Sequence, residues 1–182
     1  MQRLFQATGE TVVLTVLSED RTQSVCVERI DSRHQLRLIL EIGRPIPLHA
    51  GASSKVMLAY LPPEQVSRVI ATHGLPAVNR NTIADPIRLD EHLREIRGQG
   101  YALSFEETNE GAAGVAAPIF DQRGEIAGGL GIAGPMARFS QQSLPGLIAL
   151  VREHAGEVTR LLGGTCPPLA VPAGAGSSHG GP

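Results

Sequence analysis

Residues 47–61 read PLHAGASSKVMLAYL, and the rest of the chain is organised around this stretch. Small residues lead into the apolar run 56–61, which is typical of a buried helix. A helix that begins on bare backbone presents unpaired N–H groups, with the positive end of its dipole behind them. The N–H groups of Ala52, Ser53 and Ser54 therefore form a candidate seat for a carboxylate. The alternative is that Ser53 or Ser54 only caps a core helix, and on this stretch alone that interpretation is the simpler one.

The composition favours one soluble globular domain with a substantial core. The chain has 182 residues, of which 42% are hydrophobic and 19% charged, with a formal net charge of −2. No run is long and apolar enough to cross a membrane and Met1 begins no signal peptide, so we expect a cytoplasmic protein without a membrane partner. A net charge of −2 and a pI near 6.3 do not indicate the positively charged surface that binds nucleic acid, which argues against direct DNA binding by this segment.

The residue types that usually act in catalysis or bind metals give little support to the interpretation that this chain is an enzyme or a metal-binding protein. The two cysteines and six histidines are scattered without ligand spacing, so we expect no disulfide framework, no metal site and no cofactor. Ser54 and Lys55 suggest a serine–lysine nucleophile, but the S-x-x-K spacing would need a serine at Ala52. Glu106 and Glu107 are adjacent and make a poor acid/base pair, and His49 is a candidate base without a partner. A small hydrolase or isomerase is therefore a distant alternative.

The first half of the chain predicts strands followed by helices. The β-branched run 11–17 and the segment 24–30 read as a hairpin, and alternating leucines over 36–40 predict a further strand. Leu36 and Leu38 of that strand are candidates for a pocket floor. Prolines end the central helix and open the next, and Asp85 and Pro86 are typical of the N-cap and first residue of another helix.

The second half predicts a strand over 101–105, an acidic loop and a long hairpin, 114–121 and 125–133, that turns at Gly124. Period-two alternation then divides the return strand into two faces. We expect one face to carry Ile126, Gly128, Leu130 and Ile132, and the other Ala127, Gly129, Gly131 and Ala133. A face almost without side chains requires either a closely packed element or a ligand, and the pattern alone favours close packing.

A closing helix is expected from Ser140 to Gly163, followed by a disordered tail over 164–182 that is rich in Pro and Gly. The order of these elements implies an α+β fold in which helices pack against an antiparallel sheet.

Four segments in this order resemble the C-terminal effector-binding domain of the IclR family of bacterial transcription regulators. They are SVCVERIDS, PLHAGASSKVMLAYLP, IRGQGYALSFEETNEGAAGVAAPIFDQRGEIAGGLGIAGPMAR and the closing helix. The resemblance covers residues 4–163 and implies a GAF-like domain over 1–163, with a six-stranded antiparallel sheet flanked by helices. It also implies a homodimer or tetramer that binds a small organic acid effector. Family members bind operator DNA through an N-terminal winged helix-turn-helix, which we expect to lie outside this chain.

The resemblance also implies a ligand site. The family's pocket places the backbone amides of Ala52 and Ser53 on the ligand's carboxylate, in agreement with the helix-end argument. The candidate ligand-binding residues are Leu36, Leu38, Gly51, Ala52, Ser53, Ser54, Ser104, Glu106, Ala112, Gly114, Ile126, Gly131 and Ala133.

Several of these positions depart from the polar residues of better-known organic-acid binders. Ser104 stands where an aspartate is common, Gly114 where a cysteine is common, and Gly131 and Ala133 where serines can hold the ligand. We therefore expect an enlarged, less polar pocket for an aromatic or longer-chain acid that controls DNA binding allosterically. The alternative is an oligomerisation module whose pocket is vestigial, which predicts a filled cavity.

Overall fold

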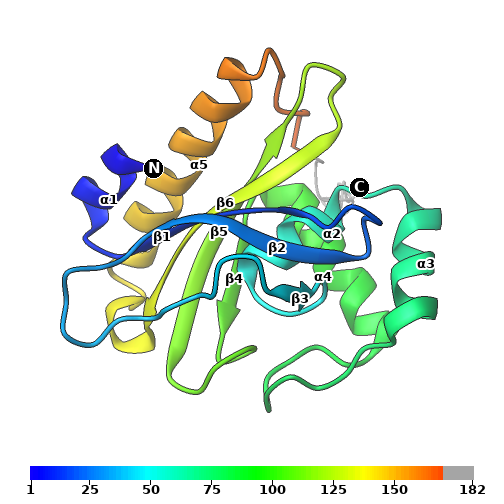
Figure 1. The fold of residues 1–182 in the computed structure, drawn as a ribbon, viewed down its shortest axis with the longest axis horizontal. Helices are drawn as coiled ribbons and strands as arrows, with labels where there is room; N and C mark the ends of the chain where they lie inside the picture. Colours follow the sequence, from blue (N-terminus) through cyan, green and yellow to red (C-terminus); the bar gives the residue numbers. More distant parts are fainter. Residues whose placement is uncertain (170–182) are drawn as a thin grey trace, which may run out of the picture.

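The computed structural model describes residues 1–169, which form a sheet between two layers of helices (Figure 1). The helices are α1 (Gln2–Thr8), α2 (Ala52–Ala59), α3 (Pro63–His73), α4 (Pro86–Gln99), the short 3-10 helix η1 (Met136–Arg138) and α5 (Leu144–Leu161). The strands are β1 (Thr11–Leu17), β2 (Gln23–Ile30), β3 (Pro45–Pro47), β4 (Ala102–Phe105), β5 (Ala112–Phe120) and β6 (Ile126–Pro135).

All neighbouring strands of the 6-stranded sheet are antiparallel, in the order β3-β2-β1-β6-β5-β4. The expected six-stranded antiparallel sheet flanked by helices is confirmed. Helices α1 and α5 cover one face of the sheet, and α2 with α4 behind it covers the other (Figure 1). Strand β5 is buried on both faces because its alternate side chains enter two separate cores.

The central helix is buried as its apolar run predicts. Val56, Met57 and Leu58 are each 0% exposed, since α2 contacts β5 and β6 on one side and α4 on the other. A helix enclosed in this way needs apolar residues on every side, which explains why its sequence lacks an amphipathic pattern.

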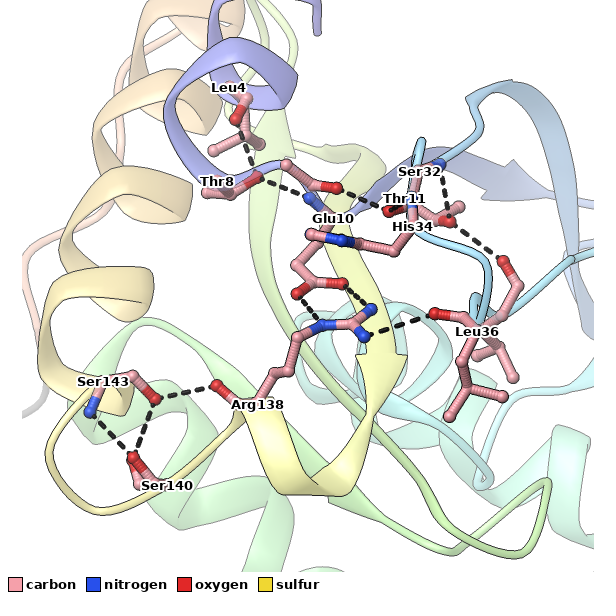
Figure 2. A network of polar contacts seen from close by, with 12 residues as sticks. Leu4, Thr8, Glu10, Thr11, Ser32, His34, Leu36, Arg138, Ser140 and Ser143 are labelled. Atoms are coloured by element: carbon pink, nitrogen blue, oxygen red, sulfur yellow. Dashed lines mark hydrogen bonds and ion pairs between the residues drawn. The ribbon is translucent and has the colours of Figure 1, made fainter.

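The start of α4 follows its sequence signals, whereas α5 begins later than expected. The Asp85 side chain accepts a hydrogen bond from Arg88 N at 2.8 Å, and Pro86 opens α4. Helix α5 begins at Leu144 and not at Ser140, because a turn comes first. In that turn Ser143 Oγ donates to Arg138 O at 2.8 Å, as Figure 2 shows.

The prediction of a strand over 36–40 is wrong, because this segment is an irregular loop. Its carbonyls are satisfied by side chains of other elements: Thr11 Oγ1 donates to Leu38 O at 2.9 Å, and Arg138 Nη1 donates to Leu36 O at 3.2 Å. The edge strand beside β2 is instead β3, in which Pro47 is paired with Gln23. Proline is tolerated there because an edge strand leaves one row of N–H groups unused.

The predicted faces of β6 hold from Gly128 onwards but fail for Ile126. The β5–β6 register shifts between Ile119 and Phe120, so Ile119 pairs with Gly128 while Phe120 pairs with Ile126. The extra residue is a β-bulge, which turns Ile126 into the core beneath α2 and away from the face of Leu130.

The expected tail begins with described residues and ends beyond them. Gly164 is buried and its N–H donates to Thr159 O at 2.9 Å, so the folded part extends past Gly163. The expectation of disorder over 170–182 falls outside the described residues. Among the helices of residues 1–169, none has the length and apolarity needed to cross a membrane.

Candidate functional site

A cavity of about 490 Å³ lies where the start of α2 meets the sheet. Its walls come from β1, the 38–47 segment, the start of α2 and the β4–β5 region. The apolar lining includes Val13, Leu38, Ile39, Leu40, Ile46, Ala50, Val78, Ala113 and Ile132. The polar lining includes Thr15, Ser53, Ser54, Ser104, Thr108 and Asn109, with Glu41 and Arg44 as charged members.

Most of the predicted site residues line this cavity. They are Leu38, Gly51, Ala52, Ser53, Ser54, Ser104, Ala112, Gly114 and Ala133. Leu36, Glu106, Ile126 and Gly131 do not line it. The Leu36 side chain is 70% exposed, and Ile126 packs in the core because of the β-bulge.

The first turn of α2 presents free backbone donors to the cavity. Gly51, at φ 85°, precedes the helix, and its own N–H donates to Glu107 Oε2 at 3.0 Å. Within residues 1–169, the N–H groups of Ala52, Ser53 and Ser54 have no hydrogen-bond partner, as expected for the first turn of a helix. We call the N–H groups of Ala52 and Ser53 the amide seat. An unsatisfied pair of N–H groups at the positive end of a helix suits a carboxylate.

The alternative interpretation, in which a serine caps α2, is wrong. No side chain among the described residues caps this helix, and the Ser54 hydroxyl is instead hydrogen-bonded to the Ser24 hydroxyl at 2.6 Å. The start of α2 therefore keeps its donors available.

A second polar group faces the same cavity. Ser104 on β4 lines the cavity and is only 7% exposed as a residue. Within residues 1–169 every buried side-chain nitrogen or oxygen has a hydrogen-bond partner. The Ser104 hydroxyl, which has no partner in the protein, is therefore open to the cavity, where a ligand or water can bind it.

The face of β6 that carries almost no side chains packs against α2 and β5 at Gly131 and borders the cavity at Ala133. A Cβ at Gly131 would lie 2.8 Å from Ser53 Oγ and 2.9 Å from Val115 O, so α2 and β5 fill that space. Close packing, which the pattern alone favoured, is therefore confirmed at Gly131. The expectation that Gly131 enlarges the pocket is wrong, whereas Gly114 and Ala133 do line the cavity.

Beside the amide seat, Lys55 is buried with 0% of its side chain exposed. Its ammonium donates to Glu107 Oε1, to Leu103 O at 2.9 Å and to His92 Nε2 at 2.9 Å. An ammonium has three N–H donors and here has three acceptors, so the charged form is fully satisfied. Burial lowers the pKa of Lys55, and the carboxylate of Glu107 opposes that shift.

His92 completes this network at the surface of α4. Its Nε2 accepts from Lys55 and its Nδ1 lies 3.3 Å from Glu95 Oε2, an arrangement that requires neutral imidazole with the proton on Nδ1. Burial, and next the positive charge of Lys55, lower the pKa of His92 in agreement with this tautomer.

Glu106 does not line the cavity but holds the β4–β5 loop in place. Its φ of 55° is in the left-handed region, and its carboxylate accepts from Gly111 N at 2.9 Å and from Arg80 Nη2 at 2.6 Å. The Gly111 hydrogen bond, and next that of Arg80, lower the pKa of Glu106. The loop fixed in this way carries Thr108 and Asn109 to the cavity wall.

A polar network fixes the 36–40 loop (Figure 2), and residues 38–40 of this loop line the cavity. Arg138 binds Glu10 and the carbonyl of Leu36, while Thr11 binds the carbonyl of Leu38. This loop therefore closes one cavity wall through long-range contacts.

Within residues 1–169 the candidate base His49 has no side chain as a hydrogen-bond partner. Its side chain is buried, and its Nε2 donates to Pro76 O at 2.9 Å. Among residues 1–169, no group of three or more His, Cys, Asp or Glu side chains is placed to hold a metal ion.

Residues 1–160 match the family model described as "Bacterial transcriptional regulator IclR C-terminal". The chain belongs to the IclR family.

Curated IclR relatives are transcription regulators. The chain is 32% identical to the Transcriptional repressor IclR of Escherichia coli over 164 residues, which is 90% of this chain and 60% of that protein. It is 33% identical to the Acetate operon repressor of Salmonella typhimurium, over 91% of this chain and 60% of that protein. The chain therefore spans about 60% of the length of these relatives. Their names describe regulators and not enzymes, consistent with the expectation that this domain is not an enzyme.

Solved IclR structures share the fold. The Thermotoga maritima IclR structure has a TM-score of 0.84 and 28% identity, and the match covers 89% of this chain and 65% of that one. The C-terminal domain of E. coli KdgR has a TM-score of 0.79 and 32% identity, covering 90% of this chain and 93% of that one.

Sequence reasoning missed the Lys55–Glu107 pair and the contribution of Thr108 and Asn109. A signal for the pair was present, because Lys55 is the one charged residue in a helix that is otherwise small or apolar. A lysine in such a position must find a buried partner. No local pattern indicated that the β4–β5 loop would reach the cavity.

Proposed function

We propose that this chain is the effector-binding and oligomerising domain of an IclR-type regulator. It binds an organic acid and thereby controls operator DNA binding by an N-terminal winged helix-turn-helix of a longer protein. The supporting observation is the amide seat, which opens into a 490 Å³ cavity together with the unpaired hydroxyl of Ser104.

The effector we propose is an aromatic or longer-chain carboxylic acid. The cavity volume falls within the range of about 300 to 1,000 Å³ that is usual for sites of drug-sized ligands. Leu38, Ile39, Ile46 and Val78 provide an apolar wall, whereas the amide seat provides donors for one carboxylate. A two- or three-carbon oxoacid would leave most of this apolar wall in contact with water.

The proposed mechanism is a population shift. An acid that binds one state of the domain better than another biases the geometry of a homodimer or tetramer in the cytoplasm. Couplings of about 1 to 3 kcal/mol change the affinity of a second site about 5- to 150-fold, which is enough for a transcriptional switch.

A thermal-shift screen of two acid classes tests this proposal. We expect stabilisation by an aromatic or longer-chain acid, amounting to about 2.7 kcal/mol when the acid is present at 100 times its dissociation constant. The methyl ester of the same acid should stabilise far less, since esterification removes the charge that the amide seat binds. Stabilisation only by glyoxylate or pyruvate would contradict the proposed acid class.

The alternative is an oligomerisation module with a vestigial pocket. The open cavity supports the sensor over this module, for which a filled cavity is expected. An absence of stabilisation by every acid in the screen would favour the module.

A further inference from the structure

The buried cation beside the amide seat has a role that goes beyond packing. We propose that Lys55, acting through Glu107, is the positioning residue that neutralises local negative charge and so allows the amide seat to accept an anion. This inference rests on the proposed function and names the residue that sets its charge selectivity.

The carboxylate of Glu107 lies near the amide seat, and without a nearby cation it would repel a bound anion. The Oε2 atom of Glu107 accepts the N–H of Gly51 at 3.0 Å, and Gly51 directly precedes Ala52 of the amide seat. A carboxylate bound to Ala52 and Ser53 therefore lies close to a second carboxylate. Two like charges in a poorly solvated site repel strongly, so an uncompensated Glu107 would exclude an anion.

Lys55 is placed to supply that compensation. Its Nζ binds Glu107 Oε1, so one carboxylate joins the ammonium to the N–H group that precedes the amide seat. Lys55 is the only lysine or arginine that is buried among residues 1–169. Arg44, the cation in the cavity lining, is 71% exposed and pairs with Glu41 at 3.6 Å, which leaves it well screened by water.

The other groups around Lys55 add no compensating charge. His92 is neutral in this arrangement, and Leu103 contributes only its carbonyl. Glu95 lies behind His92 with a side chain that is 69% exposed. The local charge at the seat is thus set by the Lys55–Glu107 pair, which sums to zero.

The two members of the pair can be separated by substitution. Lys55→Met leaves Glu107 uncompensated, and we expect it to weaken anion binding at the seat about tenfold or more. Glu107→Gln leaves Lys55 uncompensated, and we expect it to strengthen anion binding about tenfold. The double variant Lys55→Met/Glu107→Gln restores a neutral site and should bind within about threefold of the wild type. A purely structural role predicts instead that both single variants weaken binding.

Acetate, the smallest carboxylate with a methyl group, is the probe, and acetamide is its neutral control. Titration is followed through the ¹H–¹⁵N NMR signals of Ala52 and Ser53 in the whole chain. Arg94→Met is a matched charge control on α4, because Arg94 is 60% exposed and, in the part of the chain that the structure describes, pairs only with Asp90. That variant should bind acetate as the wild type does, and acetamide should shift neither signal.

The outcomes separate this inference from the proposed function. Saturable acetate shifts in the wild type, weaker binding in Lys55→Met and tighter binding in Glu107→Gln support it. Equal affinities, or weakening in both variants, overturn the role of Lys55 and leave the acid sensor standing. No acetate shift in the wild type overturns this inference, whereas the proposed function fails only if the thermal-shift screen also finds no acid that binds. If Lys55→Met does not fold, the direction of the change in Glu107→Gln decides between the charge role and the structural role.

Discussion

Arg138 donates hydrogen bonds to both carboxylate oxygens of Glu10, a residue 128 positions earlier in the chain. The Nη2–Oε2 contact is 2.7 Å, and the Glu10 side chain is only 5% exposed. The same guanidinium donates to the carbonyl of Leu36, as Figure 2 shows. One arginine therefore joins the end of α1, the end of β6 and the loop beside the cavity.

We predict that Arg138→Met destabilises the domain by about 3 kcal/mol, because the buried carboxylate of Glu10 loses its partner. Urea denaturation measures this change. Arg3→Met is the matched control: Arg3 pairs with Glu157 on the surface and is 72% exposed, so its loss should cost less than about 1 kcal/mol. Equal small effects of the two substitutions would show that the Glu10 pair is not a structural anchor.

Gly131→Ala should destabilise the domain by about 1 to 3 kcal/mol through overpacking. The new methyl would approach Val115 O to 2.9 Å, and a backbone atom cannot easily move aside. Gly146→Ala on α5 has nothing within 4 Å and should stabilise the domain by up to about 1 kcal/mol. Thermal unfolding of both variants checks these opposite signs, and a neutral Gly131→Ala would mean that α2 is less tightly packed than described.

Asp20 should make stability depend on pH in the acid range. Hydrogen bonds from Ser18 and Thr22 lower the pKa of Asp20 from 3.8 to about 2. A carboxylate whose pKa is depressed by folding stabilises the protein above its unfolded pKa, and this contribution disappears as the pH falls through the folded pKa. We therefore expect Asp20→Asn to lower the urea midpoint at pH 7 and to have a progressively smaller effect between about pH 4 and pH 2. A difference that is independent of pH would contradict this assignment.

The two thiols should react at very different rates. Cys166 is exposed, whereas Cys26 is 0% exposed and burial raises its pKa. Titration of the native protein with a thiol reagent such as Ellman's reagent should release one equivalent quickly, and the second only after denaturation. Cys166→Ser should abolish the fast phase. A fast phase in that variant would show that the β2 region opens readily.

The elements that were predicted correctly from the sequence are those whose structure is determined by residues close together in the chain. The hairpin turning at Gly124, the N-cap at Asp85 and the apolar run of α2 each depend on residues close together in the chain. The amide seat belongs to this group, because unpaired N–H groups are a property of any helix start.

The incorrect predictions concern segments whose structure depends on contacts with residues far away in the sequence. The 36–40 segment alternates like a strand, but its carbonyls are taken by Thr11 and by arginines from other elements. The inward turn of Ile126 depends on a bulge in its pairing with β5, which alternation alone does not indicate. Thr108 and Asn109 reach the cavity because Glu106 and Arg80 fix their loop. Each of these contacts joins segments that no short pattern connects.

The most direct test of the amide seat is to remove one of its donors without changing the fold. Ala52→Pro does this, because proline has no N–H and is tolerated as the first residue of a helix, as Pro86 shows in α4. Gly51 has a ψ of 154°, an extended value that suits the residue before a proline. Ala52→Gly is the matched control, since it removes only the methyl group and keeps the N–H.

The decisive measurement is the calorimetric dissociation constant of the acid that the thermal-shift screen selects. Loss of a hydrogen bond to a charged group corresponds to about 1.5 to 3 kcal/mol, so Ala52→Pro should weaken binding by at least about tenfold. Ala52→Gly should bind within about threefold of the wild type. If Ala52→Pro folds and binds the acid as tightly as the wild type, the carboxylate does not rest on the start of α2.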